Sequence, residues 1–222
     1  MKTQKTASLK LFATALTTGL MGASASAAVI QPVSVQNING GNLSNRQIEK
    51  TIDGSGMIDV NVTPTNILDD LVPVAGTSPN NYYWISSSGV ADGDPAVELI
   101  FDLGATYTVD AVHLWNYSAG NGVARWLKTV DVSFSSDNVT FGNDIDNLTF
   151  ADVPTNTQLG VDTVSFSAVS NVRYIKFSDI QNGGDSNYLA FSEIRFNEVP
   201  EPGSLALLGL GGLLIGARRR RG

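Results

Sequence analysis

The sequence predicts an all-β protein, a β-sandwich of about eight antiparallel strands. Residues 97–141 hold three short runs in which apolar and polar residues alternate, as they do in strands that bury one face. Glycine-rich or polar turns separate these runs. Similar runs return towards the C-terminus, and a total of eight or so strands suits a jelly roll.

The strands can be placed in order along the chain. Apolar residues at every second position predict the first strand over residues 97–103, and Gly104 is expected to end it. The second strand covers residues 112–117, and the third centres on residues 130–134. The later alternating runs cover residues 164–166, 173–177 and 194–196.

The composition excludes several classes of protein. The 222 residues contain no cysteine, which rules out disulfides, zinc–thiolate sites and a cysteine nucleophile. Twenty of the twenty-one acidic residues, but only seven of the fourteen basic ones, lie between residues 28 and 200, which gives this middle part a net charge of −13. A body that acidic repels phosphate backbones, so nucleic acid is not an expected partner.

The only histidine, His113, is expected to be structural. It shares a strand face with Trp115 and Tyr117, whereas Val112 and Leu114 take the opposite face. One histidine without cysteine cannot build a His-rich metal site, and no nucleophile motif such as G-x-S-x-G accompanies it. No catalytic set can be assembled from these residues, so we do not expect an enzyme.

The motifs of the central stretch resemble a known family in their order. Trp84 is followed by FDLG-x-x-Y from Phe101, by HLWNY from His113, by a turn at Arg125, and by Ser-Ser-Asp-Asn before Phe141. This order is similar to that of the discoidin, or coagulation-factor C-type, domain of the galactose-binding-like β-sandwiches. The resemblance implies one such domain over residues 28–198. The link at residues 58–81 is longer than the family's usual one.

The resemblance also implies a structural Ca²⁺. In the galactose-binding-like family an Asp-Gly loop and a Glu in the last strand commonly hold this ion. By resemblance, Asp53 and Glu193 supply side chains, while Lys50, Ser55 and Ser192 supply mainly backbone oxygens. Calcium takes six to eight hard oxygen ligands, which such a turn can offer. The alternative is a plain Asp-Gly turn with a solvent-facing Glu.

A Gly-rich turn at residues 119–128 holds the best surface candidate. At its exit, Arg125 and Trp126 offer a planar cation and a flat ring to a sugar, whose C–H faces pack on aromatic rings. Asn187 and Tyr188, just before the last strand, are ligand-binding candidates at the same end of the sandwich. In the alternative, Trp126 caps the sandwich and Arg125 pairs with a nearby carboxylate.

The N-terminus predicts export. Residues 1–27 form an expected signal peptide, with three lysines, a short apolar stretch and the small-residue pattern Ala-Ser-Ala at its end. Cleavage is expected after Ala27 or Ala28. An uncleaved membrane anchor is the poorer alternative, because the apolar stretch is short.

The C-terminal residues 199–222 differ abruptly from the rest. An apolar run over residues 205–217 would span only about 20 Å as a helix, which is short of a full membrane core of about 30 Å. The segment resembles the PEP-CTERM sorting signal of Gram-negative bacteria, and the alternative is a simple C-terminal anchor. The resemblance implies processing by an exosortase-type membrane protease after a transient stay in the inner membrane. The residues that carry it are Pro200, Glu201, Pro202, Arg218, Arg219, Arg220 and Arg221.

Together these features predict an exported, non-catalytic binding module that engages an extracellular polysaccharide or cell-surface glycan. Its expected destination is the outer surface or the extracellular matrix. The alternative is a structural matrix or surface protein without a defined small ligand.

Overall fold

The computed structural model describes residues 28–55, 57–59, 71–73, 83–89, 97–117, 124–154 and 160–199. The predicted signal peptide, the sorting segment from Pro200 onwards and most of the 58–81 link lie outside these residues. Within them, no helix is long and apolar enough to cross a membrane.

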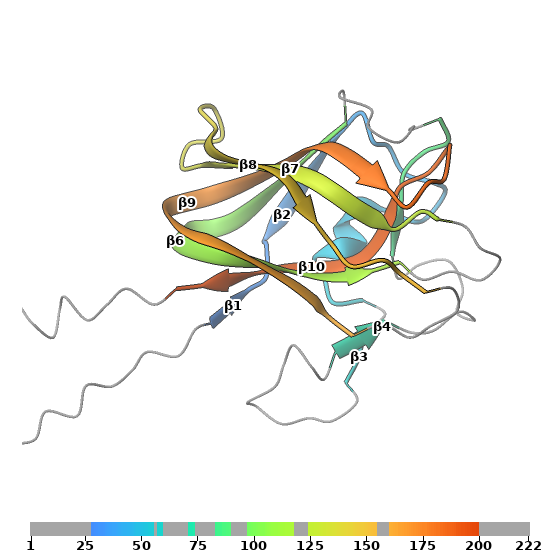
Figure 1. Cartoon of the computed structure of the whole chain (residues 1–222), viewed down its shortest axis with the longest axis horizontal. Coiled ribbons are helices and arrows are strands. Elements are labelled where there is room, and N and C mark those ends of the chain that lie inside the picture. The colour runs from blue at the N-terminus through green and yellow to red at the C-terminus, as the bar shows by residue number, and fades with distance from the viewer. Residues whose placement is uncertain are drawn as a thin grey trace, which may run out of the picture. The chain divides into compact units, whose positions relative to one another are not determined.

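The described residues form an antiparallel β-sandwich, which confirms the predicted all-β jelly roll (Figure 1). In this part of the chain, eight strands share one hydrogen-bonded sheet in the order β1-β10-β6-β9-β7-β8, with β2 beside β6 and β5 beside β10; β3 and β4 form a separate pair. The elements are β1 (Ala28–Ile30), β2 (Ser34–Ile38), the 3-10 helix η1 (Ile48–Thr51), β3 (Met57–Asp59), β4 (Leu71–Pro73), β5 (Trp84–Ile85), β6 (Glu98–Asn116), β7 (Leu127–Ser135), β8 (Gly142–Thr149), β9 (Asp162–Asn182) and β10 (Ala190–Glu198).

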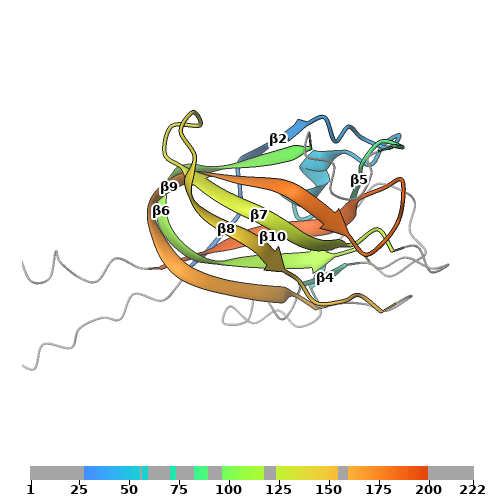
Figure 2. The same cartoon turned by 45° about the horizontal axis from the view of Figure 1, so that its top comes forward.

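Two long strands, β6 and β9, belong to both layers of the sandwich. In one layer Phe101 of β6 pairs with Ile175 of β9, and in the other Val112 pairs with Val164. Both strands therefore curve round together at one end, as Figures 1 and 2 show. We call this the bend end. The opposite end, where β6 finishes and β7 begins, is called the loop end.

The bend depends on residues with a left-handed backbone. Gly104 has a φ of +81°, and its N–H bonds to Asp102 Oδ1 at 2.8 Å. Asn171 takes a φ of 62° where β9 turns. The prediction that Gly104 ends a strand is therefore wrong, because β6 continues through it and only its pairing register shifts there.

An aromatic cluster joins the two layers. The rings of Phe101 and Phe177 lie 5.2 Å apart in one layer, and Phe196 of β10 in the other lies 5.8 Å from Phe101. All three side chains are fully buried. Apolar positions on alternate residues of β6, β9 and β10 thus meet in one core, as the alternation predicts.

The first and last described strands pair with each other. Ala28 lies opposite Glu198 in the antiparallel register of β1 and β10. Beyond β10, the Val199 N–H donates to the carbonyl of Thr108 at 2.8 Å. The residue after the predicted signal peptide and the residue before Pro200 are therefore both held on the sandwich.

A substitution at the bend tests this description. A β-carbon at Gly104 would lie 2.9 Å from Val33 Cγ1, in a backbone conformation that L-residues avoid. Gly104→Ala is expected to lower the free energy of unfolding by about 1–2 kcal/mol in a denaturant titration. Gly160→Ala, where an added β-carbon has no neighbour within 4 Å, is the control and should lower it little or not at all. Equal stability of the two variants would contradict the role of Gly104.

Candidate functional site

The structure brings the four sugar-binding candidates together at the loop end. The Ala190 N–H donates to the Arg125 carbonyl at 2.8 Å, and the Gly183 N–H donates to the Trp126 carbonyl at 3.0 Å. These bonds fasten Arg125 and Trp126 to the 183–190 segment, which carries Asn187 and Tyr188. Residues 119–123 of the predicted Gly-rich turn lie outside the described residues.

Arg125 holds this segment through an ion pair and through stacking of its guanidinium on a ring. Its Nε donates to Asp185 Oδ2 at 2.9 Å, and its guanidinium carbon lies 4.4 Å from the centre of the Tyr188 ring. Burial acts to raise the pKa of Asp185, but hydrogen bonds from Arg125 and from the Asn187 and Tyr188 N–H groups hold it below its usual value. The guanidinium thus holds the Tyr188 ring in place. The ion pair with Asp185 is also the pairing with a nearby carboxylate that the alternative interpretation of Arg125 predicts.

Trp126 packs against the backbone of the neighbouring loop. A β-carbon at Gly183 would come within 2.3 Å of two indole ring atoms, so the absence of a side chain there makes room for the ring. The indole Nε1 is buried and has no hydrogen-bond partner among the described residues. This packing agrees with the alternative in which Trp126 closes the end of the sandwich.

Three further residues at the loop end were not among the predicted site residues. The Tyr83 and Tyr117 rings lie 4.8 Å apart, and the Arg46 guanidinium lies 5.4 Å from the Tyr83 ring centre. Tyr83 and Tyr188 both pack against a small apolar cluster that includes Tyr117. We name Arg46, Tyr83, Tyr117, Arg125 and Tyr188 the loop-end cluster.

The loop-end cluster combines rings with hydrogen-bonding groups. Burial, with a further contribution from Tyr83, raises the pKa of Tyr117 to about 12, so its hydroxyl stays protonated at neutral pH. Exposed Asn187 adds an amide beside Tyr188. Flat rings with a few polar groups suit binding of an amphipathic ligand such as a sugar.

His113 takes no part in this cluster. It is buried, its Nδ1 lies 2.9 Å from Thr163 Oγ1, and burial lowers the pKa of its imidazole. It lies on β6 opposite Arg195 of β10. These observations agree with the expected structural role.

The predicted calcium residues meet at a second place. The Gly54 N–H donates to Glu193 Oε2 at 3.1 Å, so the Asp-Gly loop lies directly against β10. Glu193 is fully buried, and its Oε1 accepts from Arg195 Nε at 3.3 Å. The alternative of a solvent-facing Glu193 is therefore wrong.

The rest of the predicted set surrounds this carboxyl group. Asp53 Oδ1 accepts from the Ser55 N–H at 2.7 Å, and its Oδ2 pairs with Lys50 Nζ at 3.1 Å. Ser55 Oγ is buried, and its interaction with Asp53 acts to lower the pKa of that carboxyl group. Ser192 is buried beside Glu193, and its Oγ donates to the Asn116 carbonyl at 3.3 Å.

The chemistry of this set fits a hard cation. Burial raises the pKa of Glu193 to about 7, although Arg195 and the Gly54 N–H both act to lower it. A buried carboxyl group and a buried hydroxyl are oxygens of the kind that Ca²⁺ prefers. No three His, Asp or Glu side chains gather as a metal site in the described part of the chain, so backbone oxygens would have to complete the shell.

Comparison with known families agrees with these features. The model of the F5/8 type C domain matches residues 47–194, which is more than half of the chain, and the protein belongs to this family. The model of the PEP-CTERM protein-sorting motif matches residues 198–221. Both are the families that the sequence resembles. No curated protein sequence matches the chain.

Solved carbohydrate-binding modules share the fold. The family 32 module of NanJ from C. perfringens, solved in complex with galactose, is 15% identical with a TM-score of 0.51, and the match covers 78% of this chain and 100% of that one. Truncated AlyQ, with a family 32 module and an alginate lyase domain, is 20% identical with a TM-score of 0.50; the match covers 81% of this chain and 36% of that one. At these identities the likeness establishes the fold alone.

The buried carboxyl group predicts a pH dependence of stability. Between its ordinary pKa of 4.5 and about 7, Glu193 of the metal-free protein holds its proton more firmly when folded than when unfolded. The folded state binds more protons in that window, so this contribution to the free energy of unfolding falls as the pH rises, by about 3 kcal/mol in all. Glu193→Gln, a mimic of the protonated form, should match the wild type near pH 5 and exceed its stability at pH 8.

Denaturant titrations with a chelator present measure this difference. Glu49→Gln, at an exposed position of η1, is the control and should follow the wild type at every pH. A constant difference between the wild type and Glu193→Gln from pH 5 to 8 would show that the Glu193 carboxyl group does not titrate in this window.

Proposed function

We propose that the protein is an exported, non-catalytic module that binds extracellular carbohydrate through the loop-end cluster. The observation that carries this proposal is the arginine-braced tyrosine ring, with Arg125 stacked on Tyr188 and fixed by Asp185. The F5/8 type C family membership and the fold shared with a module solved with galactose support it.

The geometry gives a physical reason for sugar binding. A pyranose presents a C–H face that packs on an aromatic ring and a rim of hydroxyls that needs polar partners. Because Arg125 already orders the Tyr188 ring, little side-chain entropy is left to lose when a sugar packs against it. The Arg46–Tyr83 pair repeats this arrangement within the same cluster and suits contact with a second sugar unit.

We also propose the route by which the protein reaches its ligand. A signal peptidase removes residues 1–27, and an exosortase-type membrane protease processes the Pro200-Glu201-Pro202 segment while residues 205–217 lie transiently in the inner membrane. The product then reaches the outer surface or the extracellular matrix of a Gram-negative bacterium, where exopolysaccharide is available. The match to the PEP-CTERM protein-sorting motif supports this route.

A structural Ca²⁺ is the third part of the proposal. Asp53 and Glu193 would bind it through their side chains, and Lys50, Ser55 and Ser192 mainly through their backbone oxygens. The ion would join the Asp-Gly loop to β10 and neutralise a buried carboxylate. The buried Ser55 Oγ beside Asp53 and the raised pKa of Glu193 support this assignment.

Replacement of the braced ring tests the sugar site. Tyr188→Ala in the exported form of the protein should weaken binding to its best polysaccharide by about tenfold, because a stacked ring contributes roughly 1–2 kcal/mol. Affinity electrophoresis against neutral and acidic polysaccharides measures this. Tyr174→Ala is the matched control, since Tyr174 also stacks on an arginine, Arg173 at 5.1 Å, but lies on β9 outside the cluster.

Two results would contradict the proposed site. Equal losses in the two tyrosine variants would place binding elsewhere. A folded wild-type protein that binds no polysaccharide would favour the alternative of a structural matrix protein.

Removal of calcium tests the cation. If the ion is present at about one hundred times its Kd, it adds roughly 2.7 kcal/mol to the free energy of unfolding. A chelator should then lower the Tm by about 5–10 °C for a domain of this size. Glu193→Gln should abolish the chelator effect, whereas Glu198→Gln on the same strand should keep it. An unchanged Tm in the wild type would show that no structural Ca²⁺ stabilises the protein.

A further inference from the structure

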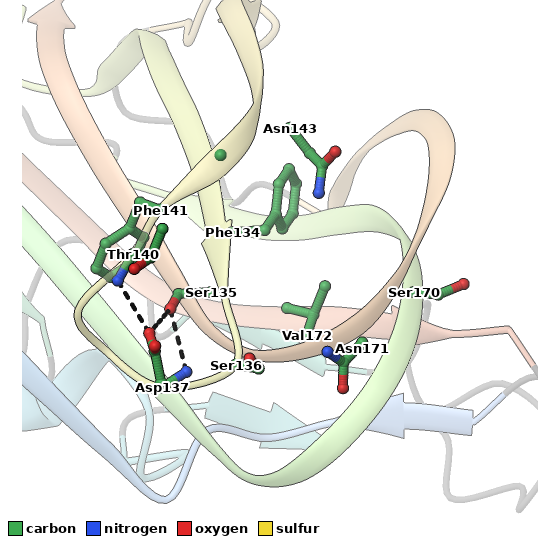
Figure 3. A pocket seen from close by; sticks show the side chains of 11 residues that line it. Phe134, Ser135, Ser136, Asp137, Thr140, Phe141, Asn143, Ser170, Asn171 and Val172 are labelled. Carbon is green, nitrogen blue, oxygen red and sulfur yellow. Dashed lines mark hydrogen bonds between the residues drawn. The ribbon is translucent and has the colours of Figure 1, made fainter.

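A polar pocket, which we call the bend pocket, lies at the bend end, away from the loop-end cluster. It has a volume of about 300 Å³ and opens between the β7–β8 turn and the bend of β9 (Figure 3). No sugar-binding or calcium candidate lines it. The residues that do are Phe134, Ser135, Ser136, Asp137, Thr140, Phe141, Gly142, Asn143, Ser170, Asn171 and Val172.

The bend pocket has an apolar floor and a polar rim. Phe134 and Val172 are buried, and the Phe134 ring is supported by Phe166 at 5.5 Å. Asn143 and Asn171 are exposed on opposite sides of the opening, one on β8 and the other on the bend of β9. The bend of β9 and the β7–β8 turn thus form opposite walls.

The polar groups of this pocket divide into two sets. Those of the turn itself are used internally: Asp137 Oδ1 accepts from Ser135 Oγ and from the Val139 and Thr140 N–H groups, each at 2.9 Å. The side-chain amides of Asn143 and Asn171, in contrast, have no hydrogen-bond partner among the described residues. Two amides thus keep donors and acceptors available beside an apolar floor.

The charge of the pocket restricts the ligand. Asp137 is the only ionisable residue in the lining, and its Oδ1 accepts three hydrogen bonds within the turn. The lining offers no cation to an acidic sugar, and the negative charge of Asp137 disfavours one. Its volume corresponds to about ten water molecules at roughly 30 Å³ each, which is room for a single sugar unit.

We propose that the bend pocket is a second carbohydrate site, which takes one neutral sugar unit between Asn143 and Asn171 over the Phe134 and Val172 floor. The amides bond to hydroxyls, and the apolar floor receives a C–H face. This assignment does not depend on the loop-end cluster.

If both sites bind, the module is bivalent; this consequence rests on the proposed function of the loop end. Strand β7 leads from beside Trp126 to Ser135 in the pocket, and its nine residues span about 25 Å. Sites at opposite ends of one rigid sandwich cannot both bind the same short oligosaccharide. They suit the joining of two polysaccharide chains, as a matrix protein requires.

Glycine substitutions separate a ligand-binding role of these amides from a backbone role. Asn143 and Asn171 both have positive φ, 57° and 62°, a conformation that glycine adopts without strain. Asn143→Gly together with Asn171→Gly removes both amides while the backbone is preserved. Asn147→Gly is the matched control, because Asn147 also has a positive φ of 54° on β8 but does not line the pocket.

The probes are galactose, glucose, mannose and their neutral tetrasaccharides, titrated into the exported form of the protein and followed by amide chemical shifts in ¹⁵N NMR. We expect shifts at residues 134–143 and 170–172 that persist in Tyr188→Ala. The double glycine variant should lose about tenfold or more in affinity at these residues with its Tm preserved, and Asn147→Gly should lose none.

Three outcomes would overturn the assignment. They are the absence of shifts at the bend pocket with every probe, unchanged binding by the double glycine variant, and shifts there only with acidic oligosaccharides such as oligouronates. Shifts at the bend pocket without any at the loop end would instead contradict the proposed function and leave this site intact.

Discussion

The structure depends on the bend that carries β6 and β9 from one layer of the sandwich into the other. Because the same two strands supply both layers, their pairing at Phe101–Ile175 and at Val112–Val164 fixes the layers relative to each other. The Phe101, Phe177 and Phe196 rings then fill the space between them. Gly104 allows this bend, because its backbone is left-handed and an added β-carbon would lie 2.9 Å from Val33 Cγ1.

The bend also determines where chemistry can occur. It brings the two ends of β6 back to the loop end, where Tyr117 follows one of them and the 83–89 and 183–190 segments lie nearby. Asp185 holds Arg125 in place there, which leaves the half-buried Tyr188 ring and the exposed Asn187 amide for a ligand. At the bend itself, Asp137 Oδ1 is bonded within the β7–β8 turn, and the Asn143 and Asn171 amides lie at the rim of the pocket. Because β6 and β9 bend in this way, the bend end and the loop end of the sandwich differ in chemistry.

The sequence predicts local features well and non-local ones poorly. Alternation placed most of the strands and the inward faces of β6, because it depends only on neighbouring residues. Gly104 was misread, since a left-handed glycine within a bent strand and one that ends a strand look alike in sequence. Arg46, Tyr83 and the buried state of Glu193 depend on contacts with residues far along the chain, and only Tyr83, which precedes Trp84, had a local signal in the sequence. Arg125 and Tyr188 were found because residue type and loop position marked each separately.

The central claim is that sugar binds at the loop-end cluster, and a crystal structure with a bound oligosaccharide tests it most directly. We predict a sugar ring whose carbon atoms lie within about 4 Å of the Tyr188 ring, with a hydroxyl bonded to Asn187 and the Arg125–Asp185 pair retained. An oligosaccharide bound only at the bend pocket or elsewhere, with Tyr188 untouched, would contradict the claim.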